Sequence, residues 1–190
     1  MRSITRWAFA PLAALALAAC NPVDGEAEKT ADATAAATPS SEPLSASLPD
    51  GLEKVALSSG LNGVLEGVGP YTVLAPMDAV VTRDAAGLDD KANSAQAAAL
   101  LRAHILPGAL TRADIAAALD KEGAGGKVEM RTMSDSVVTF SRDGKAIVVT
   151  APDGAVARLT GEETLASNGV VQPVDALLVK ATAPAAAPAG

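Results

Sequence analysis

Hydrophobic residues in the middle of the chain follow a helical spacing first and an extended spacing later. Helical spacing predicts helices at residues 50–60, 61–66, after Pro76, at 94–103 and at 111–119. Extended patterns predict strands at residues 71–74, 127–132, 136–141, 145–151, 155–159 and 170–179. Because helices dominate the first half and short strands with tight turns the second, the sequence predicts an α+β domain.

Polar residues at the ends of these segments support the predicted boundaries. Asp50 can cap the first helix, and Thr111 with Asp114 has the spacing of a capping box. Asp143-Gly144, between two alternating segments, predicts a hairpin turn.

The first twenty residues have the pattern of a bacterial export signal that ends in a lipidated cysteine. Two arginines precede an apolar run, Trp7 to Ala16, that is too short to span a bilayer. Leu17-Ala18-Ala19-Cys20 then resembles the lipobox of bacterial lipoproteins. The resemblance implies that residues 1–19 are a signal peptide and that acyl chains on Cys20 anchor the protein to a membrane. The alternative is an ordinary secreted protein with an incidental, unpaired thiol.

Composition divides the rest of the chain into a tether, one domain and a tail. Residues 20–45 hold the cysteine and an Ala-, Thr- and acid-rich segment that predicts a disordered tether, and residues 182–190 predict a disordered tail. One globular domain is predicted at residues 46–181. Without the two leader arginines, the 15 basic side chains become 13 against 22 acidic ones, a balance of −9. This charge argues against binding to nucleic acid and against electrostatic attachment to anionic lipid.

Three segments of the domain, in order, resemble conserved motifs of the fasciclin (FAS1) family. The first is Gly69-Pro70-Tyr71-Thr72-Val73-Leu74-Ala75-Pro76, the second runs from Leu100 to Gly108, and the third runs from Ser167 to Leu178. The resemblance covers nearly all of residues 46–181. It implies a single FAS1-like domain, a wedge of antiparallel-rich β-strands with several packed α-helices, placed outside the cytoplasm and used in adhesion or matrix contacts.

The resemblance gives structural or interaction roles to nine motif positions. They are Tyr71, Thr72, Pro76, His104, Pro107, Gly108, Asn168, Gly169 and Asp175. The chain departs from the family pattern at Met77, Val81, Ala103, Gln172 and Pro173. Because Met77 replaces a small polar cap, we expect Asp78 to cap the next helix. Because proline cannot donate a ladder hydrogen bond, we expect a bulge or a sheet edge at Pro173.

Residues able to support catalysis or bind a metal are few. His104 is the only histidine, and without a cysteine partner it makes a poor zinc site, so a buried imidazole bonded to backbone is favoured over a general base. The pairs Asp89-Asp90 and Glu162-Glu163 lack calcium-loop spacing and are interpreted as solvated charge. Met130 and Met133 would suit an apolar strip for a partner, although strand packing explains them as well. We therefore expect no enzymatic activity, no metal and no cofactor.

These features together predict a lipid-anchored cell-envelope protein with a non-catalytic FAS1 adhesion module. Its partner would be an envelope or extracellular protein or polysaccharide, and nucleic acid is excluded. The residue after Cys20 is Asn21, whereas an aspartate at this position commonly retains lipoproteins in the inner membrane. The resemblance therefore implies attachment to the outer membrane, where the cell has an outer membrane, with the protein facing the periplasm or the cell surface. The alternative is a carrier of a small apolar ligand, and a hydrolase ranks last.

Overall fold

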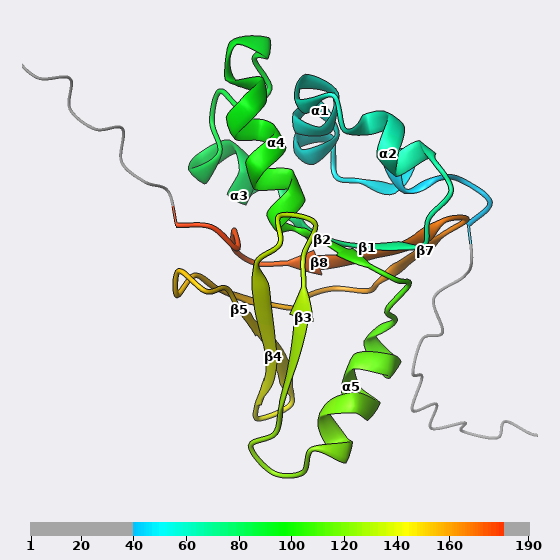
Figure 1. The fold of residues 1–190 in the computed structure, drawn as a ribbon, viewed down its shortest axis with the longest axis vertical. Coiled ribbons are helices and arrows are strands. Elements are labelled where there is room, and N and C mark those ends of the chain that lie inside the picture. Colours follow the sequence, from blue (N-terminus) through cyan, green and yellow to red (C-terminus); the bar gives the residue numbers. More distant parts are fainter. Residues whose placement is uncertain (1–39, 181–190) are drawn as a thin grey trace, which may run out of the picture. The chain divides into compact units, whose positions relative to one another are not determined.

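The computed structural model describes residues 40–180 (Figure 1). The predicted signal peptide, Cys20, most of the tether and the predicted tail lie outside this range. No helix within it is long and apolar enough to cross a membrane. The helices are η1 (Leu44–Ser47), α1 (Asp50–Ser59), α2 (Asn62–Glu66), α3 (Asp78–Asp84), η2 (Lys91–Asn93), α4 (Ser94–Ala103) and α5 (Arg112–Lys121). The strands are β1 (Tyr71–Pro76), β2 (Ile105–Pro107), β3 (Lys127–Arg131), β4 (Val137–Asp143), β5 (Ala146–Thr150), β6 (Val156–Arg158), β7 (Thr164–Ala166) and β8 (Gly169–Val174).

The strands form two four-stranded sheets. Sheet A has the order β2-β1-β8-β7, and sheet B has the order β3-β4-β5-β6. All neighbouring strands are antiparallel except β1 and β8, which run parallel in continuous register from Tyr71 opposite Gly169 to Pro76 opposite Val174. The predicted α+β class with antiparallel-rich strands is confirmed.

Sheet A is buried on both faces. Helices α1 to α4 gather on one side of it, and sheet B with α5 lies on the other (Figure 1). Successive side chains of β1 point to opposite faces of sheet A, because side chains alternate along a strand. Val73 belongs to the apolar cluster of α1 to α4, whereas Leu74 belongs to the cluster of α5 and sheet B. This explains why β1 has a continuous apolar sequence rather than an alternating one.

The folded segment begins before residue 46. Ser40 N–H donates to Leu165 O (2.7 Å), and Ser167 N–H donates to Glu42 O (2.8 Å), so the end of the expected tether lies along the outer edge of β7. Leu44 is fully buried in the first apolar cluster. The packed part of the chain therefore includes residues 40–45.

Several local expectations need correction. Asp50 is the first residue of α1 rather than its N-cap. Asp78 makes no capping bond in α3, and its Oδ1 instead accepts a hydrogen bond from Gly51 N–H (2.7 Å) at the start of α1. Met130 and Met133 do not share a strand face, because Met130 packs against the sheet B cluster and Met133 against the helical one.

Pro173 is accommodated without a bulge. It lies in β8, between β1 and β7, yet β7 pairs only with residues 169–171 of that strand. The missing N–H therefore falls beyond the end of β7, while the carbonyl of Pro173 accepts a hydrogen bond from Thr160 N–H (2.8 Å). Pro173 therefore lies where β8 is no longer paired with β7 on that side, a position that tolerates a missing N–H.

Candidate functional site

The three motif segments lie on adjacent strands of sheet A. They supply β1, β2 and β8, so residues about 100 positions apart, such as Tyr71 and Gly169, stand opposite each other. The candidate site is this three-strand region together with the loops at its ends. Its polar side chains determine which chemistry the region can perform.

Thr72 joins β1 to the segment that follows β2. Its side chain is fully buried. The hydroxyl donates to Gly108 O (2.7 Å) and accepts from Leu110 N–H (2.8 Å). Gly108 has a φ of 96°, a left-handed conformation that favours glycine. The hydroxyl therefore holds a turn, and both of its hydrogen-bonding roles are satisfied inside the domain.

His104 is fully buried at the end of α4, and both ring nitrogens are occupied. Nδ1 lies 2.8 Å from Leu100 O, and Nε2 lies 3.0 Å from the backbone nitrogen of Leu178. Because Leu178 N–H can only donate, Nε2 accepts and Nδ1 carries the proton, which defines a neutral imidazole. Burial lowers the pKa of His104 from 6.5 to about 4, partly opposed by the hydrogen bond to Leu100. The imidazole therefore links α4 to the C-terminal segment and has no free nitrogen to act as a base.

Asn168 connects three separate segments. Its Nδ2 donates to Leu65 O and Gly67 O (both 2.8 Å), and its Oδ1 accepts from Leu44 N–H (2.8 Å). The next residue, Gly169, is buried so closely that an added Cβ would overlap the carbonyl oxygen of Tyr71. The fold thus requires both residue types, the asparagine for its three hydrogen bonds and the glycine for the close backbone approach, in addition to turning the chain into β8.

The other motif residues divide between the interior and the surface. Asp175 Oδ1 accepts from the Arg158 backbone N–H (2.7 Å), an amide of β6. Pro76 is buried at the end of β1, Tyr71 is half-buried, and Pro107 is exposed. Of these residues, Pro107 is exposed, whereas Tyr71 and Asp175 are each half-buried and leave part of their side chains open to a partner.

A groove lies where the first and third motifs begin. It has a volume of about 720 Å³ and is lined mainly by residues 66–70 and 165–170. Val68 at its rim is 99% exposed, which is unusual for a branched apolar side chain in such a loop. Much of the groove wall is backbone and apolar side chain, so it suits contact with a surface more than chemistry on a substrate.

Sequence reasoning missed a buried polar cluster around Gln172. Its side chain is fully buried, and Nε2 donates to Glu163 and to Leu110 O, while Oε1 accepts from the Arg112 guanidinium (3.0 Å). Glu163 also accepts from Arg112 N–H (2.6 Å), so this carboxylate is not the solvated charge that we expected. Burial lowers the pKa of Arg112, and Glu163 opposes that shift. The departure of Gln172 from the family pattern was the available signal.

The described residues hold no group of three or more His, Cys, Asp or Glu side chains that could bind a metal ion. The carboxylate of Asp90 has a local role, because its Oδ1 accepts from Ala92 N–H (2.9 Å) at the start of η2. Among the motif positions, the side chains of Thr72, His104, Asn168 and Asp175 complete hydrogen bonds of the fold.

The two sheets and the helices packed on one face of sheet A define a single α+β domain. The family model described as the Fasciclin domain matches residues 51–180. The chain therefore belongs to the fasciclin-domain family, whose domains are adhesion and interaction modules and are generally non-catalytic.

Among solved structures, the chain is similar to a FAS1 domain pair from the insect cell adhesion molecule fasciclin I. The two share 17% sequence identity with a TM-score of 0.54, over 67% of this chain and 43% of that one. The likeness supports the fold, and the chain spans less than half the length of the domain pair. A comparison with curated proteins gave no match.

Proposed function

We propose that this protein is a lipid-anchored component of a bacterial cell envelope, whose fasciclin domain is a non-catalytic adhesion module for a protein or polysaccharide. The observation that carries the proposal is the state of the motif side chains. Thr72, His104, Asn168 and Asp175 all have hydrogen-bond partners inside the domain. A domain whose polar motif groups are engaged in this way offers shape and surface to a partner.

The anchor in this proposal is Cys20, supported by its lipobox-like context and the apolar run before it. Two or more acyl chains give stable membrane attachment, whereas one chain gives only marginal attachment. We expect the wild-type chain, expressed in a bacterial host, to incorporate labelled palmitate and to sediment with membranes. Cys20→Ser should abolish both. Membrane sedimentation of Cys20→Ser equal to wild type would contradict the anchor.

The tether in this proposal is residues 22–39. Residues 40–45 are excluded because they are packed against β7 and the helical cluster. Deleting residues 22–39 should weaken attachment of cells to their partner surface, because the domain loses reach, without lowering its melting temperature. A deletion of residues 182–190 serves as the control for a change in chain length. Equal attachment with and without residues 22–39 would argue against a tethering role.

Affinity capture tests the adhesion function directly. Residues 40–180, immobilised through one end, should retain a saturable protein or polysaccharide from envelope extract, identified by mass spectrometry. Competition by the same soluble segment establishes specificity. Absence of any saturable ligand of either class, from extracts of several bacterial envelopes, would count against adhesion.

A second candidate function is carriage of a small apolar ligand. The favouring observation is a cleft of about 710 Å³ between α4, the loop after α3 and the C-terminal segment, with Leu88, Leu100, Leu177 and Val179 in its lining. Native mass spectrometry of the purified protein should then show a bound apolar molecule. Ala99→Trp would fill this cleft and expel the ligand, whereas Ala95→Trp on the same helix lies outside the lining and should not.

A further inference from the structure

Among residues 40–180, three of the four outer sheet edges already have partners. Residues 40–42 cover β7. The turn between β3 and β4 covers β2, since Met133 N–H donates to Ile105 O (2.8 Å). On β6, Arg158 N–H donates to Asp175 Oδ1 (2.7 Å), and Asp175 N–H donates to Arg158 O (3.1 Å). The remaining edge is that of β3.

The register of β3 shows which of its backbone groups point outward. Thr132 N–H donates to the directly opposed Ser136 O (2.8 Å), so the even-numbered residues of this segment bond to β4. The N–H and C=O groups of Lys127, Glu129 and Arg131 consequently face away from β4. No hydrogen bond within residues 40–180 reaches these outward groups. An edge of this kind is a template for another strand.

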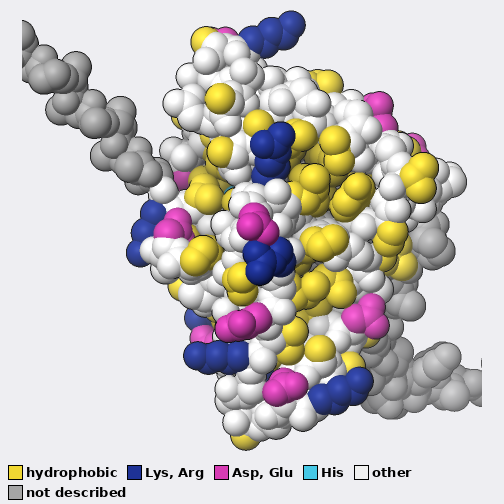
Figure 2. Space-filling model, in the orientation of Figure 1, with side chains coloured by type: hydrophobic (Ala, Val, Ile, Leu, Met, Phe, Trp, Pro, Cys, Tyr) yellow, Lys and Arg dark blue, Asp and Glu magenta, His cyan; other side chains and the backbone are white. Residues whose placement is uncertain are grey.

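An apolar groove runs beside this edge. It has a volume of about 260 Å³, nearly nine times the roughly 30 Å³ that one water occupies in the liquid. Its apolar lining comes from α5 and its approach and from β3 and β4, namely Leu110, Ile115, Ala118, Val128, Met130 and Phe140. In the same orientation as Figure 1, hydrophobic side chains gather between the upper helices and α5 (Figure 2).

We propose that a partner protein supplies an extended segment that joins the β3 edge as an added antiparallel strand of sheet B. Its residues opposite Val128 and Met130 would be aliphatic and would enter the groove beside α5. Its residues opposite Lys127, Glu129 and Arg131 would be acidic, basic and acidic. The proposal rests on the adhesion function above and assigns it a partner class, a polypeptide strand, because outward N–H and C=O groups are complemented by an extended backbone.

The charges of β3 argue against a second copy of this strand as the occupant. Antiparallel pairing of β3 with itself over its full length would place Lys127 opposite Arg131 and Glu129 opposite Glu129, and like charges directly opposite are destabilising. A segment with the acidic-basic-acidic pattern forms opposite-charge pairs at all three positions. The same charges discourage unrelated apolar strands, so they select the partner as well as the register.

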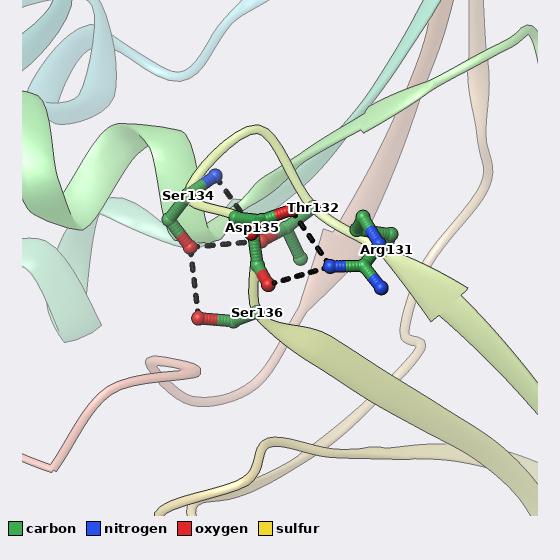
Figure 3. Close-up of polar contacts among 5 residues, drawn as sticks. All are labelled: Arg131, Thr132, Ser134, Asp135 and Ser136. Carbon is green, nitrogen blue, oxygen red and sulfur yellow. Dashed lines mark hydrogen bonds and ion pairs between the residues drawn. The ribbon is translucent and has the colours of Figure 1, made fainter.

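The end of β3 is held by a network of hydrogen bonds in the turn (Figure 3). Thr132 Oγ1 lies 2.8 Å from Ser134 Oγ, which donates to Ser136 Oγ (3.1 Å). Arg131 Nη1 forms an exposed ion pair with Asp135 Oδ1 (2.7 Å). An exposed pair of this kind is weak, so Arg131 can also meet an acidic residue of an added strand. The turn therefore presents β3 in a fixed geometry.

The test uses a blocked seven-residue peptide, SEVKLES, which has the proposed pattern. Residues 40–180, shown by circular dichroism to be folded, should bind the fluorescent peptide saturably in an anisotropy titration. Methylating the peptide nitrogen of its lysine removes the N–H that faces Glu129 and should lower affinity about three- to tenfold. The matched control methylates the leucine nitrogen, which points away from β3, and should change affinity less than twofold.

Two protein variants test the groove and the register. Ala118→Leu fills the groove and should abolish peptide binding, whereas Ala117→Leu, at an exposed α5 position outside the groove lining, should not. Glu129→Lys should weaken SEVKLES about two- to fivefold and strengthen SEVELES, whose central residue is acidic, by a similar factor. Thermal melts identify any variant that fails to fold, and the two methylated peptides then decide the question on the wild-type protein.

Any of four results would overturn the proposal. The first three are no saturable binding of SEVKLES at millimolar concentration, equal weakening by both methylated peptides, and unchanged affinity in folded Ala118→Leu. Self-association through β3 that the peptide displaces would also overturn it, because the edge would then belong to a second copy. None of these results alters the envelope-capture experiment, so the adhesion function and its assignment to β3 fail independently.

Discussion

His104 makes the free energy of unfolding depend on pH, and replacing it by glutamine should remove most of this contribution. In the folded protein its pKa is lowered to about 4, because a charged imidazole would be desolvated. In the unfolded chain the pKa returns to about 6.5. Between these values the unfolded state binds one proton more than the folded state, so the free energy of unfolding falls as the pH falls. The full stability is therefore present above pH 6.5 and is lost progressively down to pH 4.

The magnitude follows from the two pKa values. Each unit of pKa difference corresponds to about 1.4 kcal/mol. His104 should therefore lower the free energy of unfolding by about 1–2 kcal/mol at pH 5.5 and by about 2–3 kcal/mol at pH 4.5, relative to pH 7.5 or above. At pH 7.5 the glutamine variant should itself be less stable by about 1–3 kcal/mol, because the side chain cannot satisfy both Leu100 O and Leu178 N–H in the same geometry.

Urea unfolding of wild type and His104→Gln at pH 7.5, 6.5, 5.5 and 4.5 measures both effects. Taking the difference between the two free energies of unfolding at each pH cancels the contribution of the carboxylates, which titrate in both proteins. We expect the stability advantage of wild type to shrink by about 1–2 kcal/mol between pH 7.5 and 5.5. A difference that stays constant over this range would refute a neutral, desolvated His104, as would one that grows on acidification.

Further substitutions test other contacts described above. Asn168→Ala removes three hydrogen bonds between separate segments and should lower the free energy of unfolding by about 2–4 kcal/mol in urea; a loss under 0.5 kcal/mol would contradict this role. Gly169→Ala places a Cβ against Tyr71 O and should prevent soluble expression, whereas Gly63→Ala has open space and should express normally. Thr111→Ala breaks the capping box of α5 and should cost about 1 kcal/mol, and an unchanged urea midpoint would argue against the cap.

Short-range signals in the sequence predicted much of the fold because they act within a few residues. The capping box at Thr111 and the turn at Asp143-Gly144 appear where expected, since each depends on local backbone geometry. The helix at residues 94–103 was also correct to the residue. The order of helical and extended patterns predicted the α+β class, and the family motifs added the FAS1-like fold.

Strands β2 and β7, each only three residues long, were missed. They exist because β1 and β8 offer hydrogen-bonding partners. The cluster of Arg112, Glu163 and Gln172 was missed for a related reason. Its members are up to 60 positions apart, and their charges resemble ordinary surface charge until the sheet brings them together.

The sequence by itself determined the pattern of helices and strands, the family and the lipobox-like start, because each is a property of neighbouring residues or of motif order. Only the tertiary structure decided the protonation of His104, since that depends on Leu178, which is 74 positions away. It also decided which strand edge stays open. The segment from Lys127 to Arg131 alternates as any amphipathic strand does. Its edge is open because no hydrogen bond within residues 40–180 reaches its outward N–H and C=O groups.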